Sequence, residues 1–471
     1  MQKIVQTLSL LFSAAVPGIG TATAADGALD TRFGTNGIAL TGLVDADPVP
    51  SGCKPIVQPD GGIVVCGTRR ANDATGSDFV VARFDADGAL DADFGTGGLV
   101  TIDFDHGAGG DQANGIAMQA DGSFIVAGTT HGAEPHSANF AVARLTADGR
   151  LDTAFAAAGK TIVSFDRDKG AGDDNVYAMT LQPDGAIVLA GSAETADGIE
   201  AAVARLNPDG TLDTTFGADG RVTFRFGLVG TGASDAADGV AIDADGRIVI
   251  AGSAQVTDPQ EDTEFAAARL LHDGTFDTSF DGDGRATIPF DPGTGVSDAI
   301  AFGLMIQRDG RIVIPGYANA SEFAMKNMDM ALARLDPDGS LDATFGNGGR
   351  VLIALDLEPD GIDAALDVVE QSDGRLLLVG TSLAGLVQYG TAARVTSTGV
   401  LDDSFGTLGT ATYDLGLTDP SSTQAFTGAA LQGTQFIVAG IGYVPPLGSP
   451  QPLDYFVVRL SDEMLFADGF E

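Results

Sequence analysis

Apolar and polar residues alternate in short runs along most of the chain. One stretch shows the pattern clearly, because residues rich in Val, Ile, Ala and Phe alternate over 113–119, 123–128, 139–145 and 159–165. Short runs with a period of two are typical of half-buried β-strands. The stretch therefore predicts four strands, and no segment after residue 24 predicts a helix longer than a single turn.

The segments between these runs carry turn residues. Gln-Pro-Asp-Gly, at 58–61 and again at 182–185, predicts a type I turn with a left-handed Gly and hence a tight hairpin between the first two strands. Between the third and fourth strands, Asp-Gly is followed by Leu-Asp-x-x-Phe-Gly. That phrase predicts a turn that leads into one helical turn capped by its Asp.

The same unit of four strands recurs along the chain. The third strand of each unit carries an Arg, and successive Arg residues lie 60 to 65 residues apart. They are Arg83, Arg144, Arg205, Arg269, Arg334, Arg394 and Arg459. Four antiparallel strands in each of seven such units predict an all-β fold, a seven-bladed β-propeller of four-stranded antiparallel blades.

The two ends of the chain fit a closed ring. After residue 24 the chain opens in mid-unit, with Leu-Asp-x-x-Phe-Gly and then a fourth-type strand near 38–43. It closes with a third-type strand at 455–460 and lacks the fourth. We expect the N-terminal strand to complete the last blade, which removes two open sheet edges. The alternative is a linear array of repeats that needs end caps.

The repeated phrases carry a family resemblance. Ala-Arg-Leu-x-x-Asp-Gly-x-Leu-Asp-x-x-Phe-Gly, followed by Gln-x-Asp-Gly-x-Ile-x-Val-x-Gly, resembles the delta-60 repeat of bacterial exported proteins, and the match covers nearly the whole chain after residue 24. The resemblance implies a propeller-like β-repeat and no catalytic residues or established ligand. The seventh unit departs most, since Gln432-Gly433-Thr434 replaces its Asp-Gly turn.

Charge and the N-terminus restrict the partners and the compartment. The 65 acidic residues outnumber the 25 Lys and Arg, so the net charge is −40, which excludes binding driven by phosphate neutralisation. Residues 1–24 have a cationic start, an apolar stretch and Ala22-Thr23-Ala24, which predicts a cleaved signal peptide. We expect a single propeller over 25–461, a C-terminal tail over 462–471, no membrane span and no nucleic-acid partner. The protein would be secreted, periplasmic or bound to the cell envelope.

The recurring Arg needs an acidic partner on an otherwise apolar strand. Six units place an Asp eight residues later, and the chain start supplies Asp30 for Arg459. These residues are Asp91, Asp152, Asp213, Asp277, Asp342 and Asp402. We predict structural ion pairs, and the alternative is a ring of arginines that binds an anion. We also expect the recurring Gly at the end of each second strand to avoid a neighbouring blade or to adopt a positive φ.

Cysteine and metal chemistry are less defined by the sequence. Cys53 and Cys66 flank a hairpin turn and either form a disulfide or remain reduced. His106, His131 and His136 lie on expected loops, but their spacing matches no metal motif. Asp166, Asp168 and Asp173 resemble part of a calcium loop, so calcium is the one cofactor that the sequence suggests.

The variable loops on one rim of the propeller are the expected place for recognition. No nucleophile, metal-protease or phosphate-loop motif is present. The sequence therefore favours an exported, non-catalytic binding module whose variable rim contacts a protein, a glycan or a surface ligand. The alternative is a propeller hydrolase or lyase whose site is assembled from rim Asp and His residues.

Overall fold

The structure is a computed structural model of the 471-residue chain. It describes residues 26–43, 53–70, 76–104, 110–132, 138–165, 172–227, 234–256, 263–290, 298–319, 328–355, 357, 361–384, 387–415, 424–443 and 453–462. Residues 1–25, and with them the expected signal peptide, lie outside the described residues, as does the expected tail after Asp462. No helix in the described part of the chain is long and apolar enough to cross a membrane.

Every regular element in the described ranges is a β-strand. In chain order they are β1 (Ile38–Leu40), β2 (Ile56–Val57), β3 (Ile63–Arg70), β4 (Ser77–Phe84), β5 (Leu99–Ile102), β6 (Asp111–Met118), β7 (Phe124–His131), β8 (Ala138–Leu145), β9 (Lys160–Val163), β10 (Asp174–Leu181), β11 (Ile187–Thr195), β12 (Gly198–Leu206), β13 (Arg221–Phe224), β14 (Asp235–Ile242), β15 (Ile248–Gln255), β16 (Thr263–Leu270), β17 (Arg285–Ile288), β18 (Ala299–Ala301), β19 (Met305–Ile306), β20 (Ile312–Asn319), β21 (Met328–Leu335), β22 (Arg350–Ile353), β23 (Ile362–Glu370), β24 (Leu376–Ala384), β25 (Val387–Val395), β26 (Thr410–Tyr413), β27 (Gln424–Gln432), β28 (Gln435–Tyr443) and β29 (Leu453–Leu460).

Leu-Asp-x-x-Phe-Gly forms a single hydrogen-bonded turn capped by its Asp, as the sequence predicts, and the turn is too short to be a regular helix. In the first repeat, Phe94 N donates to Asp91 O at 3.0 Å. Asp91 Oδ1 accepts from Asp93 N at 3.0 Å, so its side chain takes a backbone donor inside the turn. Gly95 follows with a φ of 54°, which stops a right-handed helix from continuing.

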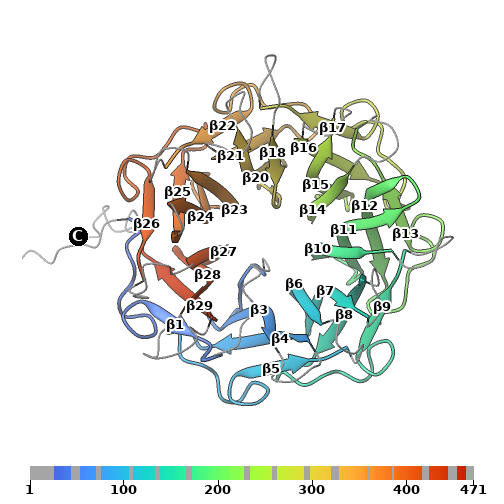
Figure 1. Ribbon diagram of the computed structural model, residues 1–471, viewed down its shortest axis with the longest axis horizontal. Helices are drawn as coiled ribbons and strands as arrows, with labels where there is room; N and C mark the ends of the chain where they lie inside the picture. Colours follow the sequence, from blue (N-terminus) through green and yellow to red (C-terminus); the bar gives the residue numbers. More distant parts are fainter. Residues whose placement is uncertain are drawn as a thin grey trace, which may run out of the picture.

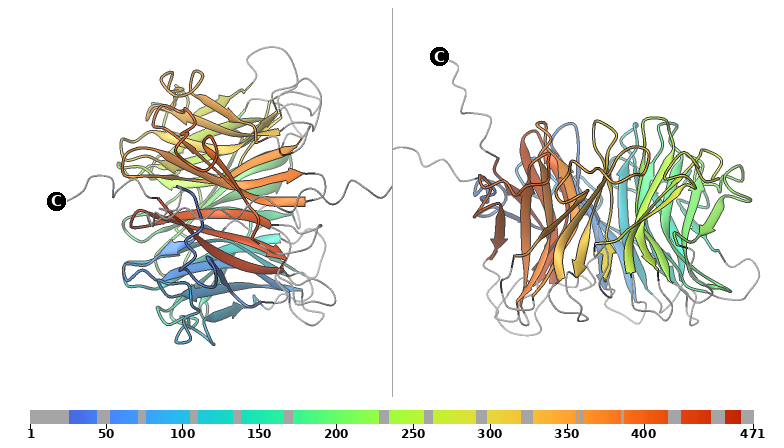
Figure 2. Two further views of the ribbon diagram at one scale, coloured as in Figure 1. Left: turned by 90° about the vertical axis from the view of Figure 1, so that its left-hand side faces the viewer. Right: turned by 90° about the horizontal axis from the view of Figure 1, so that it is seen from above.

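The strands form four-stranded antiparallel sheets arranged around a central axis (Figure 1). Five sheets have exactly four strands, while a sixth contains nine because one parallel pair, Met328 with Ile362, connects β21 to β23. In each repeat the first strand is innermost and the fourth is outermost. Figure 2 shows the strands running between two rims, so the connections collect on the rims.

The chain ends meet in one sheet, whose order is β1–β29–β28–β27. Ile38 pairs with Val458, and Leu40 pairs with Phe456. Beside this ladder, Gly27 N donates to Ser461 O at 2.8 Å, and Ser461 N donates to Ala28 O at 2.9 Å. The first described residues therefore supply the outer strand of this sheet and a turn beside its end.

The core lies between adjacent sheets and is built from second and third strands. Seven of the nine residues of β11 and six of the nine of β12 form uninterrupted buried runs, since both faces of these strands meet a neighbouring sheet. Small residues such as Ala202 and Ala204 are fully buried there. This explains why the central strands contain continuous apolar runs and not a simple alternation.

The recurring Gly of the second strand is explained by a bulge in the first strand. In β14 the pairing register shifts between Ala237 and Gly239, which turns the carbonyl of Ala236 toward β15. A Cβ on Gly252 would lie 1.8 Å from that oxygen, and the φ of Gly252 is not positive. The clash at Gly252 is thus with its own sheet, and the expected positive φ is wrong. The expected clash with a neighbouring blade holds at Gly67, Gly128 and Gly316, whose Cβ atoms would meet the rings of Tyr455, Phe79 and Phe265 from the adjacent sheet at 2.2, 2.8 and 2.5 Å.

Candidate active site at the channel rim

Six of the repeats place one side chain of the innermost strand at the same position, and in five of them this position is a β-bulge. In β6, β10, β14, β23 and β27 the register shift isolates a single residue. These residues are Asn114, Tyr177, Asp238, Leu366 and Thr427, and Phe302 takes the equivalent place between β18 and β19. The backbone is common to the repeats, but the side chain at this position changes from one repeat to the next.

A cavity of about 960 Å³ opens beside two of these bulges. It lies between the β10–β13 and β14–β17 sheets, and Ile300 of β18 extends its wall to the next sheet. The connection Ala196–Asp197–Gly198 between β11 and β12 forms part of its edge, which places the cavity on the rim of variable loops. Its size is in the range of small-molecule and cofactor sites.

Asp238 is the residue of this cavity with the most perturbed acidity. Its side chain is half-buried, and Ser253 Oγ lies 3.4 Å from Asp238 Oδ2. Burial raises the pKa of Asp238 to about 7, although the hydrogen bonds from Ser253 act in the opposite direction. Ser253 is itself fixed, because its Oγ accepts from Ala301 N of the adjacent strand at 3.1 Å. A carboxyl group of this acidity holds a proton near neutral pH and can donate it.

Tyr177 and two further carboxyl groups complete the cavity. Tyr177 Oη and Ser192 Oγ are 3.2 Å apart, the same arrangement of bulge residue and second-strand hydroxyl as in the Asp238 pair. Burial raises the pKa of Tyr177, as does the charge of Asp238, so its hydroxyl stays protonated. Asp173 and Glu194 line the cavity, and Asp173 N donates to Glu194 Oε2 at 3.3 Å. The site thus combines a proton donor, a phenol and additional carboxyl groups.

The recurring arginines are all paired with acids and stack on aromatic rings. Arg83 Nε donates to Asp91 Oδ2 at 2.7 Å, and its guanidinium carbon lies 4.6 Å from the centre of the Phe94 ring. The same arrangement holds four later pairs, which are Arg144–Asp152, Arg205–Asp213, Arg269–Asp277 and Arg334–Asp342. Arg394 forms an ion pair with Asp402, with Nε 2.8 Å from Oδ2, and also lies over its Phe405 ring. Arg83 also donates to Ala147 O of the next sheet at 2.7 Å. These arginines are therefore tied within and between sheets, and they do not line the cavity.

Arg459 takes its acid from the other end of the chain. Its Nε and Nη2 donate to Asp30 Oδ2 at 3.0 and 2.8 Å, and both side chains are buried. Its Nη1 donates to Ala86 O of the β2–β5 sheet at 3.1 Å. Arg394 also contacts the chain ends, because Asp26 Oδ2 accepts from its Nη2 at 2.7 Å.

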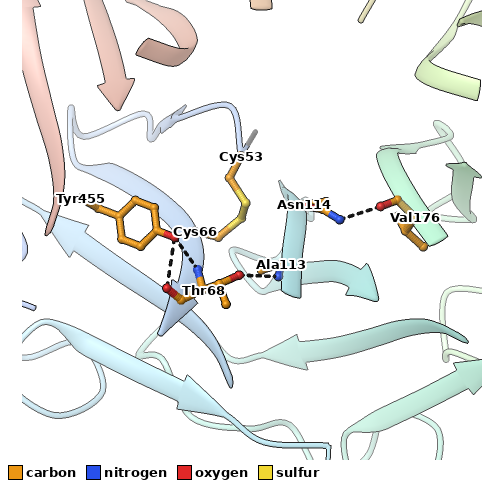
Figure 3. Close-up of a disulfide and its surroundings, with 7 residues drawn as sticks. All are labelled: Cys53, Cys66, Thr68, Ala113, Asn114, Val176 and Tyr455. Atoms are coloured by element: carbon orange, nitrogen blue, oxygen red, sulfur yellow. Dashed lines mark hydrogen bonds between the residues drawn. A yellow bond between two sulfur atoms is a disulfide. The ribbon is translucent and has the colours of Figure 1, made fainter. Parts of the chain in front are cut away.

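The two cysteines form a disulfide beside the short strand β2 (Figure 3). The Cα atoms of Cys53 and Cys66 are 5.4 Å apart. Next to them, Tyr455 Oη accepts from Thr68 N at 2.7 Å and donates to Thr68 O at 3.1 Å, so the β1–β29 sheet is fastened to β3.

The metal candidates of the sequence do not form a described cluster. His106, His136, Asp166 and Asp168 lie outside the described residues. His131 ends β7 and is not on a loop, and its Nδ1 lies 3.1 Å from Gly110 O. Asp173 lines the cavity instead, where it accepts from Ala138 N at 3.3 Å through Oδ1.

The sequence interpretation missed two features of this rim. Carboxylate oxygens of Asp78, Asp103 and Asp111 lie within 4.8 Å of one another, and calcium prefers such oxygen ligands. Asp111 has a role in the fold, however, because its Oδ2 accepts from Phe104 N at 2.8 Å and closes the loop before β6. Asp238 was also missed, and its only signal was an acid at a repeat position where other units carry Asn, Tyr or Phe.

The comparisons with known proteins agree with the repeat. A family model described as "Domain of unknown function (DUF5122) beta-propeller" matches residues 58–94, 119–155, 182–216, 244–280 and 307–345. The chain is a β-propeller repeat protein. The match supports a propeller repeat family but does not single out the delta-60 repeat. A comparison with curated protein sequences found no match.

Several solved structures resemble the propeller at low identity. The polysaccharide lyase Uly1 is 10% identical, with a TM-score of 0.44 over 91% of this chain and 94% of that chain. The α-L-arabinanase of Penicillium chrysogenum, complexed with arabinobiose, is 11% identical, with a TM-score of 0.43 over 89% and 97%. The α-L-arabinofuranosidase of Fusarium graminearum is 12% identical, with a TM-score of 0.42 over 73% and 91%.

The predicted function requires a correction here. The sequence favoured a non-catalytic binding module, but these similar structures are a polysaccharide lyase, an arabinanase and an arabinofuranosidase. Of the three expected His residues only His131 is described, and it does not line the cavity, whose polar lining consists of acids, hydroxyls and an amide.

Proposed function

We propose that this propeller is a hydrolase or lyase that cleaves glycosidic bonds, with Asp238 as the proton donor to the leaving oxygen. The observation that carries the proposal is a half-buried carboxyl group in a rim cavity, with its pKa raised to about 7 by burial. Pairs of carboxyl groups with different acidities are the usual means of glycosidic bond cleavage. Here the second carboxyl group comes from Glu194 or Asp173.

In the hydrolytic form of the reaction, the proton of Asp238 moves to the oxygen of the leaving sugar as the bond to the anomeric carbon breaks. Water adds to that carbon, and the second carboxylate accepts the proton that the water loses. Ser253 orients the Asp238 carboxyl group, and Ser192 orients the Tyr177 hydroxyl beside it. In a lyase, a base removes a carbon-bound proton instead, and the product carries an unsaturated ring.

The test is Asp238→Asn, which keeps the shape of the side chain but cannot donate a carboxylic proton. Purified wild type and variant are incubated with arabinan, β-glucan, mannan, polygalacturonate and alginate, and new reducing ends and unsaturated products are measured. We expect cleavage by the wild type, a loss of at least about 100-fold in kcat for the variant, and loss of the basic limb of the pH profile. Asp245→Asn, in the exposed turn of the same repeat at the opposite rim, is the control. Full activity of Asp238→Asn, or no cleavage by the wild type, would contradict the proposal.

We also propose that the propeller has seven blades and is closed by β1. The support is that the backbone hydrogen bond from the Gly of Leu-Asp-x-x-Phe-Gly to the following repeat is also present at the chain ends. Gly95 N donates to Asp148 O of the following repeat at 2.9 Å, and at the ends Gly406 N donates to Asp26 O at 3.0 Å and Gly34 N to Asp87 O at 2.7 Å. The two repeated phrases likewise support assignment to the delta-60 type.

Export through a signal peptide at 1–24 is part of the same proposal, with the propeller over 25–461 and the tail over 462–471. The Cys53–Cys66 disulfide supports an oxidising compartment, outside the cell or in the periplasm or envelope. The intact mass of the protein recovered from the producing cells tests it, because cleavage after Ala24 leaves a chain that begins at Ala25. A mass that includes residues 1–24 would contradict it.

A further inference from the structure

Two aromatic residues lie on either side of Asp238 at the equivalent positions of the neighbouring inner strands. Tyr177, Asp238 and Phe302 occupy the equivalent bulge position of three consecutive inner strands, β10, β14 and the β18–β19 segment. We call them the Tyr177–Asp238–Phe302 row. The strands are in close contact here, because a Cβ on Gly239 would lie 2.6 Å from the carbonyl carbon of Gly303. The three side chains therefore start from adjacent points of one surface.

Both rings of the row are exposed although the rest of the propeller buries its aromatic residues well. Tyr177 is 40% and Phe302 36% exposed, whereas Phe216, in the turn after β12, and Phe265 of β16 are fully buried. The two rings are also held in place. Tyr177 is hydrogen-bonded to Ser192, and the ring of Phe302 lies 5.7 Å from the ring of Tyr317, centre to centre. Exposed rings with fixed orientation provide apolar contact area at little conformational cost.

The charge around the row selects against anionic ligands. Among the described residues that line the cavity, none is Lys or Arg, while five are acidic. They are Asp173, Glu194, Asp197, Asp235 and Asp238. The whole chain adds a net charge of −40, so a polysaccharide of uronic acids would be repelled as it approached. A neutral sugar chain escapes this repulsion and can use both the apolar rings and the acceptor oxygens.

We infer that the substrate is a neutral polysaccharide bound across the row, with one sugar on Tyr177, another on Phe302 and the scissile bond at Asp238. The inference rests on the proposed function and adds the class of substrate and the mode of attack. Because the two rings lie on both sides of Asp238, the polysaccharide is held on both sides of the glycosidic bond that breaks. Cleavage is then hydrolytic and internal, and the first products are a mixture of oligosaccharides.

The experiment separates binding from cleavage. Binding is measured in the Asp238→Asn variant, so that the polysaccharide is not cleaved during the assay. The measurement is retardation in native gels that contain arabinan, β-glucan or mannan, with polygalacturonate and alginate as the anionic probes. Tyr177→Ala and Phe302→Ala are added singly to this background and to the wild type. Leu366→Ala is the matched control, since it removes a half-buried apolar side chain from the equivalent position outside the row. Circular dichroism verifies that each variant is folded.

We expect retardation by at least one neutral polysaccharide and by neither anionic probe. Each aromatic variant should weaken this binding about 2- to 10-fold, and Leu366→Ala should leave it unchanged. Retardation by no neutral probe, preference for an anionic probe, or equal loss in Leu366→Ala would overturn the inference.

The outcomes also distinguish the two proposals. Neutral binding that depends on Tyr177 and Phe302, without cleavage by the wild type, would support the binding row and overturn the enzyme. Cleavage that requires Asp238 but is unchanged in both aromatic variants, or that releases only single terminal sugars, would support the enzyme and overturn the row.

Discussion

Replacement of Asp30 by Ala tests how the chain ends are held together. Asp30 Oδ2 accepts two hydrogen bonds from Arg459, and its Oδ1 accepts from Arg32 N at 3.1 Å. Burial alone would raise the pKa of Asp30, but the hydrogen bonds from Arg32 and Arg459 hold it well below its ordinary value. The side chains of Asp30 and Arg459 are 5% and 11% exposed, so Asp30→Ala leaves a guanidinium group in a nearly dry site. The loss of one partner of such a pair costs about 3–5 kcal/mol.

The matched control is Asp91→Ala, which breaks the equivalent pair inside a continuous segment of chain. The side chains of Arg83 and Asp91 are 16% and 30% exposed, so water compensates more of the loss and the free energy of unfolding should fall less. Urea unfolding measures both costs. Limited proteolysis with mass analysis of the fragments measures access to residues 26–43, which only Asp30→Ala should expose. Equal costs for the two variants, or an N-terminal segment as resistant as in the wild type, would refute the reasoning.

Two further variants test the packing and the acidity of buried groups. Gly252→Ala should destabilise the protein by at least about 1–3 kcal/mol in urea unfolding, because the new Cβ would meet Ala236 O at 1.8 Å. Gly227→Ala, whose Cβ would meet only Gln255 O at 3.5 Å, should have little effect, and similar losses in both would contradict the packing explanation. Burial raises the pKa of Asp454 to about 6, although hydrogen bonds from Thr41, Gly42 and Leu43 act in the opposite direction. The protonated side chain is therefore favoured in the folded state, so its contribution to the stability is full below about pH 4 and is lost as the pH rises through about 6. Asp454→Asn removes this titration. The free energy of unfolding of the variant, relative to that of the wild type, should therefore increase between pH 4 and 7 by about 1.4 kcal/mol for each unit of the pKa shift. A difference that stays constant with pH would argue against the titration of Asp454.

The propeller repeat was predictable because its determinants are local and repeated. The alternation of apolar residues, the Asp-Gly turns and the eight-residue spacing from Arg83 to Asp91 each report on a hairpin within one repeat. One local expectation, a positive φ at the recurring Gly, failed for a local reason. Gly252 is required by a bulge in the neighbouring strand that no periodicity reveals.

The candidate site was not predictable because it depends on contacts between sheets. Tyr177, Asp238 and Phe302 are about 60 residues apart in sequence, and only the stacking of inner strands places them on one wall. The acidity of Asp238 depends on burial by the neighbouring sheets and on Ser253, neither of which a motif encodes. The loop histidines attracted attention by residue type alone, and the one that is described, His131, lies at the end of a strand.

The bulge position connects the architecture to the chemistry. The repeated residues have the same role in each repeat. The Arg stacks on its Phe, pairs with its Asp and hydrogen-bonds the next sheet, while the recurring Gly leaves space for the bulge. These constraints fix the backbone of the inner strands, while the type of the bulge side chain differs between repeats. The repeats carry Asn, Tyr, Asp, Phe, Leu and Thr there. A rigid frame that presents a different side chain from the same position of several repeats can acquire a proton donor and flanking aromatic rings by single substitutions, without any change in the fold.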